Sequence, residues 1–225
     1  MLEGFRDCHC HLLPGVDDGV QKADETLQIL RQWEEAGVKE VWLTPHIMED
    51  IPNEPAKLKD KFAELQRLYK GTISLHLAAE HMMDGLFLKR LEANNVLPIG
   101  SDGTRMLVET SYYIPPMNMA AIIDSIKAKG YDPILAHPER YQYMGRNDYR
   151  KWKEKNILFQ LNLPSLVGAY GPEVLSKAEW LLKEGMYDYC GSDTHSMEQV
   201  ELFLGGVISK KTVKKVRRIA EGQEL

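Results

Sequence analysis

The sequence predicts an α/β protein in which helices cover a parallel sheet. Short apolar runs alternate along the chain with longer segments that have the spacing of amphipathic helices. Glycine follows four of the expected helices, at Gly37, Gly71, Gly130 and Gly185, where a left-handed cap favours it. Repeated strand–helix units of this kind are typical of a parallel sheet with helices outside it.

Each expected strand is an apolar run that a polar residue closes or follows. The expected strands span residues 5–11, 40–44, 73–79, 105–109, 133–136, 157–162 and 187–191. The expected helices span residues 22–36, 55–69, 85–94, 117–129, 148–155, 172–184 and 210–221. In the first helix, Leu27, Leu30 and Trp33 recur at three-residue steps and form one apolar stripe. This pattern leaves a choice between a closed barrel and an open doubly wound sheet.

The composition favours one soluble domain over residues 1–225 and excludes several classes of protein. Lys plus Arg is 28 and Asp plus Glu is 33, so the net charge of −5 lacks the basic footprint of a nucleic-acid binder. No apolar run approaches the roughly 20 residues needed to span a bilayer. An ordered motif begins at Asp7, which leaves no room for a signal peptide, and we expect a cytoplasmic protein without membrane insertion. The basic segment 210–218 is expected to be the solvated face of a terminal helix.

The three cysteines indicate a reducing compartment rather than a disulfide framework. Cys8 and Cys10 are expected to pack on the back of the first strand. None of the three cysteines begins a C-x-x-x-x-x-R phosphatase loop, and G-x-S-x-G, P-loop and dinucleotide motifs are absent from the sequence.

The strongest chemical signal is the opening motif Asp7-Cys8-His9-Cys10-His11. Strand alternation predicts that Asp7, His9 and His11 share one face, with the cysteines on the other. Two imidazoles about 7 Å apart along a strand can converge on one cation, since a strand rises about 3.3 Å per residue. Asp7 would then be a ligand or would orient one.

Residues that can bind metal recur at the carboxyl ends of the other expected strands. In a parallel barrel these ends share one face, where such enzymes place their active sites. The candidate ligands are His9, His11, His46, Glu80, Glu109, His137, Asp193 and His195. Eight donors exceed the needs of a single catalytic zinc and predict two or three divalent ions, with a carboxylate such as Glu109 as the bridge. Mixed imidazole and carboxylate donors favour Mn, Fe or Zn, and clustered ions of this kind hydrolyse phosphoesters.

Two further features are compatible with phosphate chemistry. Arg140 follows His137 by three residues and is expected to bind a phosphoryl group, the alternative being a salt bridge to Glu139 or to an acid of a helix. Asp17 and Asp18 lie in a turn-rich loop after the first motif. Asp18 is either a turn former or helix cap or a group that orients a ligand, and the structural role is favoured for both residues.

The motifs together resemble those of the polymerase-and-histidinol-phosphatase (PHP) superfamily. The resemblance rests on residues 7–19, Thr44-Pro45-His46, Glu80, Leu107-Val108-Glu109, residues 135–141 and Ser192-Asp193-Thr194-His195. Within that superfamily, the motifs most closely resemble those of the capsule-type, manganese-dependent protein tyrosine phosphatases of bacteria. It implies a distorted (β/α)7 TIM-like barrel, a three-metal site of Mn²⁺ held by the eight candidates, and phosphoryl binding by Arg140. It also implies a phosphotyrosine partner, a bacterial tyrosine kinase of exopolysaccharide or capsule synthesis.

The function that follows is hydrolysis of phosphotyrosine by a metal-bound hydroxide. Members of the family often carry a second arginine after the final histidine, whereas residues 196–199 contain none. His81, beside Glu80, is a further departure and either carries a proton or has no role. The alternatives are a small-molecule phosphomonoesterase of the histidinol-phosphatase kind and a non-enzymatic module that binds phosphorylated tails. No feature of the sequence indicates a particular oligomeric state.

Overall fold

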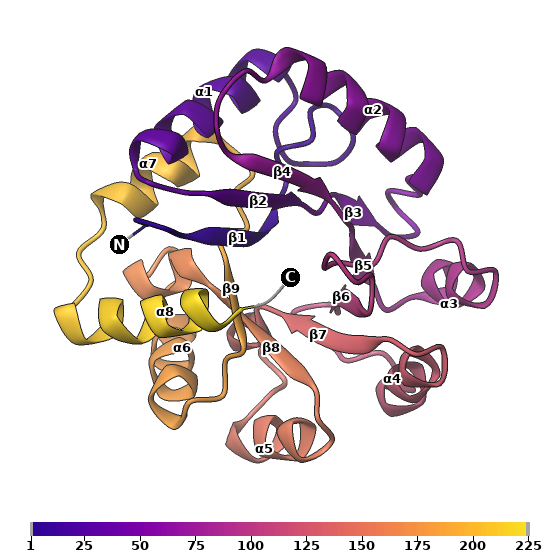
Figure 1. The fold of residues 1–225 in the computed structure, drawn as a ribbon. Coiled ribbons are helices and arrows are strands. Elements are labelled where there is room, and N and C mark those ends of the chain that lie inside the picture. The colour runs from indigo at the N-terminus through magenta and orange to yellow at the C-terminus, as the bar shows by residue number, and fades with distance from the viewer. Residues whose placement is uncertain (1, 224–225) are drawn as a thin grey trace.

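The computed structural model describes residues 2–223, which alternate between strands and helices as the sequence predicts (Figure 1). The strands are β1 (Arg6–Cys10), β2 (Glu40–Leu43), β3 (His46–Ile47), β4 (Ser74–Leu77), β5 (Glu80–Met82), β6 (Arg105–Glu109), β7 (Asp132–Ala136), β8 (Leu158–Asn162) and β9 (Tyr189–Gly191). All their pairings are parallel, in two sheets ordered β1-β2-β4 and β3-β5-β6-β7-β8-β9. The parallel α/β class is therefore confirmed.

The helices lie around the outside of the curled sheets (Figure 1). They are α1 (Ala23–Glu35), α2 (Pro55–Leu68), α3 (Gly85–Glu92), α4 (Met119–Ala128), α5 (Arg146–Glu154), α6 (Pro172–Glu184), α7 (Met197–Gly205) and α8 (Lys210–Gly222), with short 3₁₀ turns at Pro138–Arg140 and Leu163–Val167. The sequence did not predict α7, which Ser196 caps by accepting a hydrogen bond from the Gln199 N–H. No described helix combines the length and the apolar character that a membrane crossing needs.

Two of the predicted strands continue, after a break, as short strands that the sequence did not predict. β3 follows β2 after two residues, and β5 follows β4 after two residues. Pro45, between β2 and β3, has no N–H to donate and interrupts the first ladder. These breaks separate the two sheets and put His46 and Glu80 at the start of paired strands, in register with each other.

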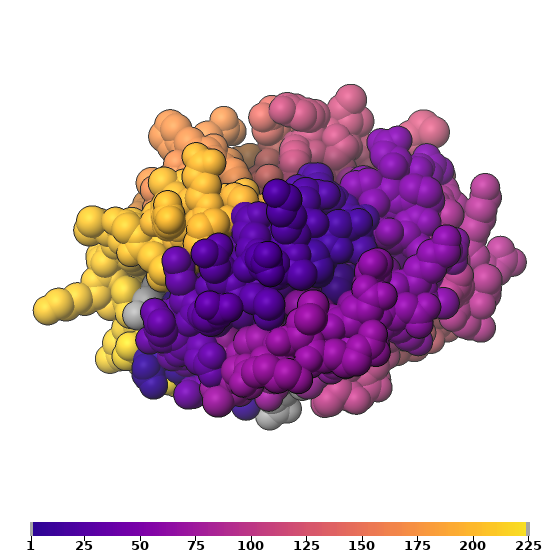
Figure 2. Space-filling model, turned by 90° about the horizontal axis from the view of Figure 1, so that it is seen from above, coloured from indigo at the N-terminus to yellow at the C-terminus, as the bar shows by residue number. Residues whose placement is uncertain are grey.

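The first and last strands, β1 and β9, approach each other closely. The Asp193 N–H donates to the His9 carbonyl at 2.7 Å, and the His11 N–H donates to the Thr194 carbonyl at 2.9 Å. At the opposite end of these strands, the Gln223 side chain bonds the Arg6 carbonyl and the Cys190 N–H. Figure 2 shows the same proximity on the surface, where the yellow C-terminal part adjoins the indigo N-terminal part.

The core comprises two clusters, and the two N-terminal cysteines lie in different ones. Cys8 packs with Trp42 and Leu107 in the smaller cluster, whereas Cys10 packs in the larger. Both cysteines are core residues, as predicted, but they do not share one packing surface, because the register of β1 against β2 shifts between Asp7 and Cys10. An irregularity of this kind redirects side chains beside functional sites.

The expected glycine caps hold at three of four positions. Gly37, Gly130 and Gly185 follow their helices with φ of 93°, 87° and 70°. Gly71 does not cap α2, because that helix ends earlier and its C-cap, Tyr69, is extended. The other predicted ranges differ from the observed ones mostly at their ends, where boundaries are least determined by local sequence.

Candidate metal centre

The structure brings all eight predicted metal-binding residues together. Most of them reach one region from the carboxyl ends of strands or the turns that follow, whereas His46 and Glu80 reach it from the first residues of β3 and β5, just beyond β2 and β4. The buried ones are His9, His11, His46, Glu80, Glu109, His137 and Asp193, and His195 is partly exposed. Burial of so many ionisable groups is costly unless they are paired or bind ions.

Their donor atoms form three overlapping groups, each compact enough for one cation. The first contains His9, His11, Glu80 and Asp193, the second His46, Glu80 and Glu109, and the third His11, Asp18, His46 and His195. Glu80 Oε2 lies 3.2 Å from His9 Nε2 and 3.2 Å from His46 Nδ1. His137 Nε2 joins the same carboxylate, 2.9 Å from Oε1. Glu80 therefore belongs to two groups, whereas Glu109 belongs to one.

Several of these atoms lack hydrogen-bond partners, which fits metal ligands. Among the described residues, the buried Nδ1 atoms of His46 and His137, Glu80 Oε2 and Glu109 Oε1 make no hydrogen bond. His46 Nδ1 is only 3.0 Å from Glu109 Oε1, yet the two are not aligned as donor and acceptor. Atoms that aim at a common point rather than at each other have this geometry, and their chemistry suits Mn, Fe or Zn.

The charges of the cluster support the same conclusion. Burial lowers the pKa of His9, but Glu80 and Asp193 outweigh burial and raise that pKa to about 9. Burial raises the pKa of the Glu80 carboxyl, but His9 and the neighbouring histidines hold it well below its usual range. The metal-free cluster is therefore a set of buried ion pairs, in which divalent cations can replace protons.

Side chains behind the cluster fix which imidazole nitrogen faces it. Asp17 Oδ2 contacts His11 Nδ1 at 2.9 Å and accepts from the His46 N–H at 3.0 Å. Gln160 Oε1 contacts His9 Nδ1 at 2.9 Å. Both contacts leave Nε2 toward the centre of the cluster, the usual arrangement around metal-binding histidines. The sequence favoured a structural role for Asp17, and Asp17 does stabilise a turn by accepting from the Gly19 N–H. The sequence did not predict that Gln160 contacts a histidine, and its one signal is that it is a polar residue within an apolar strand.

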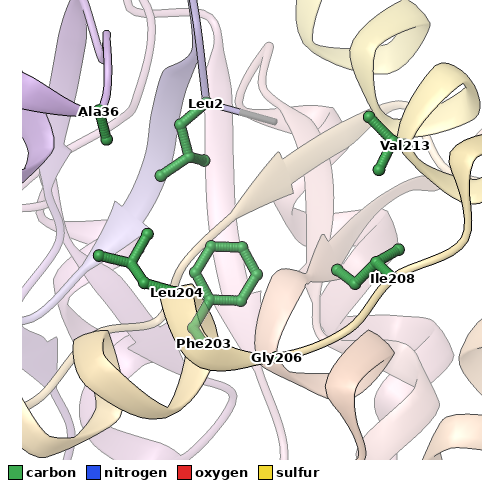
Figure 3. Close-up of a pocket in the computed structure, with 7 residues that line it drawn as sticks. All are labelled: Leu2, Ala36, Phe203, Leu204, Gly206, Ile208 and Val213. Atoms are coloured by element: carbon green, nitrogen blue, oxygen red, sulfur yellow. The ribbon is translucent and has the colours of Figure 1, made fainter.

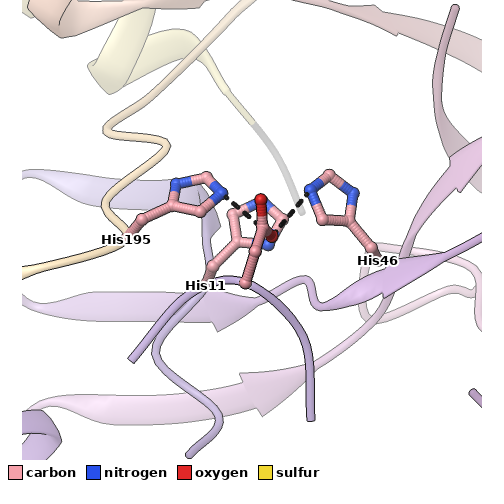
Figure 4. A group of neighbouring side chains, drawn as sticks. His11, His46 and His195 are labelled. Atoms are coloured by element: carbon pink, nitrogen blue, oxygen red, sulfur yellow. Dashed lines mark ion pairs between the residues drawn. The ribbon is translucent and has the colours of Figure 1, made fainter. Parts of the chain in front are cut away.

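Asp18 also belongs to the site, although the sequence assigned it a structural role. Its Oδ1 lies 3.5 Å from His46 Nε2 and 3.7 Å from His195 Nε2. His11, His46 and His195 converge from three segments of the chain (Figure 4). Burial and His11 lower the pKa of His195 to about 4, so its imidazole is neutral and retains a lone pair for a cation.

Asp7 does not join the cluster, although strand alternation predicted a shared face. Its Oδ1 accepts from the backbone N–H groups of His9 and Ser192 and so ties β1 to the end of β9.

Two residues of the site have left-handed backbones, His137 with φ 33° and Asp193 with φ 51°. Non-glycine residues rarely adopt this conformation, and it concentrates at functional sites.

Arg140 lies at the edge of the cluster, with its guanidinium between two tyrosines. Its Nη1 donates to Asp193 Oδ2 at 2.6 Å, and its Cζ lies 4.3 Å from the ring centroids of both Tyr112 and Tyr170. The alternative partner, Glu139, is buried elsewhere and accepts from the Ser165 and Tyr187 hydroxyls.

These groups line a pocket of about 370 Å³ above the cluster. Its lining residues are Asp18, His46, Glu80, Tyr112, Arg140, Tyr170, Asp193, His195 and Gln199. Arg140 is the only arginine or lysine among them.

A larger hollow of about 400 Å³ lies beside α7 and α8 (Figure 3). Its lining consists of apolar residues and one glycine, and none of these has a side chain that could carry out a reaction.

His81 is outside this pocket. Its Nε2 accepts from the Leu97 N–H at 3.4 Å, and its ring packs 5.5 Å from that of Phe87. Burial lowers the pKa of His81 to about 4, so it is a neutral core residue rather than a proton carrier at the pocket.

A curled parallel α/β fold with a buried histidine–carboxylate cluster near its strand ends is typical of the class of metal-dependent hydrolases. Residues 5–215 match the model of the CpsB/CapC family of capsular polysaccharide synthesis, and the chain belongs to that family.

The chain is similar to proteins that are named as tyrosine-protein phosphatases. YwqE of Bacillus subtilis (strain 168) is 27% identical over 198 residues, which cover 85% of this chain and 78% of YwqE. The putative tyrosine-protein phosphatase CapC of Staphylococcus aureus is 25% identical over 219 residues, covering 92% of this chain and 84% of CapC.

Solved structures show the same fold. One from a study of YwqE and of CpsB from Streptococcus pneumoniae, described as unique metal-dependent tyrosine phosphatases, has a TM-score of 0.79 at 22% identity and covers 97% of this chain and 95% of its own. The phosphotriesterase homology protein of Escherichia coli, with phosphate in its active site, has a TM-score of 0.54 at 12% identity and covers 97% of this chain and 92% of its own.

Proposed function

We propose that this protein is a metal-dependent phosphatase of phosphotyrosine in proteins. The observation that carries the proposal is the pocket in which three overlapping groups of donor atoms lie beside a single, preplaced guanidinium. The names of the relatives supply the substrate class, and the donor set supports a metal requirement.

Divalent cations bound to this cluster would activate water and offset the charge of the phosphoryl group. The protein's own residues orient the reaction. Of the five N–H groups of a guanidinium, Arg140 uses one on Asp193 within residues 2–223, so the others are available to phosphoryl oxygens. Tyr112 and Tyr170 restrict the guanidinium to one plane, and Asp17 and Gln160 hold the two imidazoles of β1 in place. Tyrosinate, with a free pKa of about 10, is a tolerable leaving group.

Finer parts of the proposal follow from the resemblance of the motifs. Mn²⁺ is the expected metal, with Fe and Zn also compatible with the donors. The expected substrate is a bacterial tyrosine kinase that acts in capsule or exopolysaccharide synthesis, in keeping with the description of the family. We further propose that residues 1–225 form a single domain with the distorted (β/α)7 topology, supported by the bonds between β1 and the end of β9, and that the protein is cytoplasmic.

The test is phosphate release from a phosphotyrosine peptide in Mn²⁺, with and without a chelator. We expect release that the chelator abolishes, and Arg140→Ala should bind Mn²⁺ normally but lose turnover about 100-fold or more. Arg146→Ala is the matched control, because Arg146 stacks on Trp180, 5.1 Å from the ring centroid, outside the pocket lining. Normal turnover by Arg140→Ala would remove Arg140 from the mechanism. Faster turnover of small phosphomonoesters than of peptides would favour a small-molecule phosphatase, and phosphopeptide binding without release would favour a binding module.

A further inference from the structure

The loop that joins β6 to α4 exposes large apolar side chains. Tyr113 is 68% exposed, Ile114 72% and Met117 fully exposed. We call these three residues the β6–α4 patch. No charged residue occurs between Thr110 and Asn118, so nothing in this loop offsets their apolar character. Apolar side chains gathered at the surface commonly mark an interaction site.

The patch begins one residue beyond the wall of the pocket. Tyr112 lines that pocket, and its ring lies 4.3 Å from Arg140 Cζ and 5.7 Å from the ring of His137. The loop follows Glu109 at the carboxyl end of β6, and loops in this position share the face on which the metal centre lies. A polypeptide that places a phosphorylated side chain in the pocket must cross its rim, and this loop begins at the part of the rim that Tyr112 forms.

The loop is held in place without the help of its exposed side chains. The Tyr112 carbonyl accepts from the Gln142 N–H at 2.7 Å, and the Pro116 carbonyl accepts from the Met119 N–H at 3.1 Å. Pro115 and Pro116 have fixed φ angles, which limits the backbone further. A surface that is already ordered loses little conformational entropy when a partner binds.

We propose that the β6–α4 patch binds apolar side chains that flank the phosphotyrosine of a polypeptide substrate. The proposal rests on the proposed function and adds a substrate preference to it. The pocket is small and polar, and it suits the phosphorylated side chain, whereas the patch offers mainly apolar contact, with the Tyr113 hydroxyl as its one polar side-chain group. Flanking residues with charged side chains would lose water there without gaining a partner, so the patch selects apolar neighbours.

The test compares two substrates of one reaction, p-nitrophenyl phosphate and a phosphotyrosine peptide with leucine or valine on both sides. The variant is Y113S/I114S/M117S. We expect its KM for the peptide to rise roughly tenfold, the effect of losing about 1.4 kcal/mol of binding. Its kcat/KM for p-nitrophenyl phosphate should remain within about twofold of wild type, because that substrate does not reach the patch. Val207→Ser is the matched control, since Val207 is 96% exposed in the turn after α7 and should alter neither substrate.

A second peptide, with aspartate on both sides of phosphotyrosine, completes the comparison. Wild type should prefer the apolar peptide, and the triple variant should lose that preference. An unchanged peptide KM in the variant would overturn the proposal, and so would an equal loss on both substrates. A peptide KM that is unchanged while the variant shifts from dimer to monomer in light scattering would assign the patch to a second copy of the chain. If wild type hydrolysed neither substrate, the proposed function itself would fail.

Discussion

Arg140 lies between two aromatic rings, and this contact limits where its guanidinium can move. Tyr112 precedes it by 28 residues and Tyr170 follows it by 30, so neither contact is visible as a local motif. Burial lowers the pKa of Arg140, but Asp193 more than compensates and keeps it above its usual range, so the side chain stays charged. A lone cation that is held in a fixed plane suits a pocket whose other lining residues include no arginine or lysine.

Replacement of Tyr170 tests this arrangement. Tyr170→Leu removes one aromatic face, and we expect kcat/KM to fall roughly 5- to 30-fold, the range for a cation–π contact of about 1–2 kcal/mol. Tyr170→Phe retains the face and loses only the 3.3 Å contact of the hydroxyl with Asn162 Nδ2, so its activity should stay near wild type. Steady-state kinetics of the two variants gives this comparison, and the Mn²⁺ content of each variant is measured in parallel. An equal fall in both would assign the effect to the hydroxyl instead.

Sequence reasoning at the residue scale identified the donors but not the side chains that orient them. His9 and His11 are recognisable from their two-residue spacing in the opening motif, and His46 from its place after an apolar run. Gln160 contacts His9 and His137, which lie 151 and 23 residues away, and Asp17 contacts the His46 N–H, 29 residues away. Such contacts exist only once the strands are side by side.

At the scale of elements, the approach of β1 to β9 depends on a glycine. A Cβ atom on Gly191 would lie 2.6 Å from His9 Cβ and 2.9 Å from His9 N. Real side chains do not pack this closely, so the end of β9 can lie beside His9 only because residue 191 has no side chain.

We therefore expect Gly191→Ala to weaken both stability and metal binding. Overpacking of this kind typically costs about 1–3 kcal/mol of unfolding free energy. The displacement of His9 should also lower the affinity for Mn²⁺, which titration calorimetry measures, while urea unfolding measures stability. Gly205→Ala is the matched control, because a Cβ there meets nothing within 4 Å. Equal behaviour of the two variants would contradict the close packing at Gly191.

The strands differ in how well the pattern of apolar residues predicts them. The apolar runs predicted the positions of β2, β6, β7 and β8 to within a residue, because buried parallel strands are largely apolar. Periodicity did not predict β3 and β5, because two or three residues carry no period. Their pairing depends on the neighbouring strand rather than on their own sequence.

At the scale of the molecule, the metal centre links distant parts of the chain. Its candidate ligands extend from His9 to His195, so bound cations would connect the first strand to the last. Ligands that bind only the folded state stabilise it by mass action.

Metal removal should therefore lower the melting temperature, and the effect should depend on pH. Burial lowers the pKa of His9, but Glu80 and Asp193 raise it from 6.5 to about 9 in the metal-free fold. The stability from these ion pairs is complete below the unfolded pKa of about 6.5 and disappears as the pH rises through about 9. Mn²⁺ competes with protons, so its stabilisation grows over the same range, to roughly 5–10 °C at 100-fold excess over Kd. Thermal melts with Mn²⁺ and with chelator between pH 6.5 and 9 should diverge, and parallel curves would contradict the prediction.

The sequence by itself determined the α/β class and the positions of the main strands along the chain, and it placed eight candidate donors at or near the ends of these strands. These features follow from local information: apolar runs specify most buried strands, and strand ends in parallel topology share one face. Only the tertiary structure decided that Glu80 belongs to two groups of donors, that Asp18 joins His46 and His195, and that Tyr112 and Tyr170 enclose Arg140. These contacts join residues far apart in the chain, and their geometry is set by the curvature and register of the sheets, which no short stretch of sequence encodes.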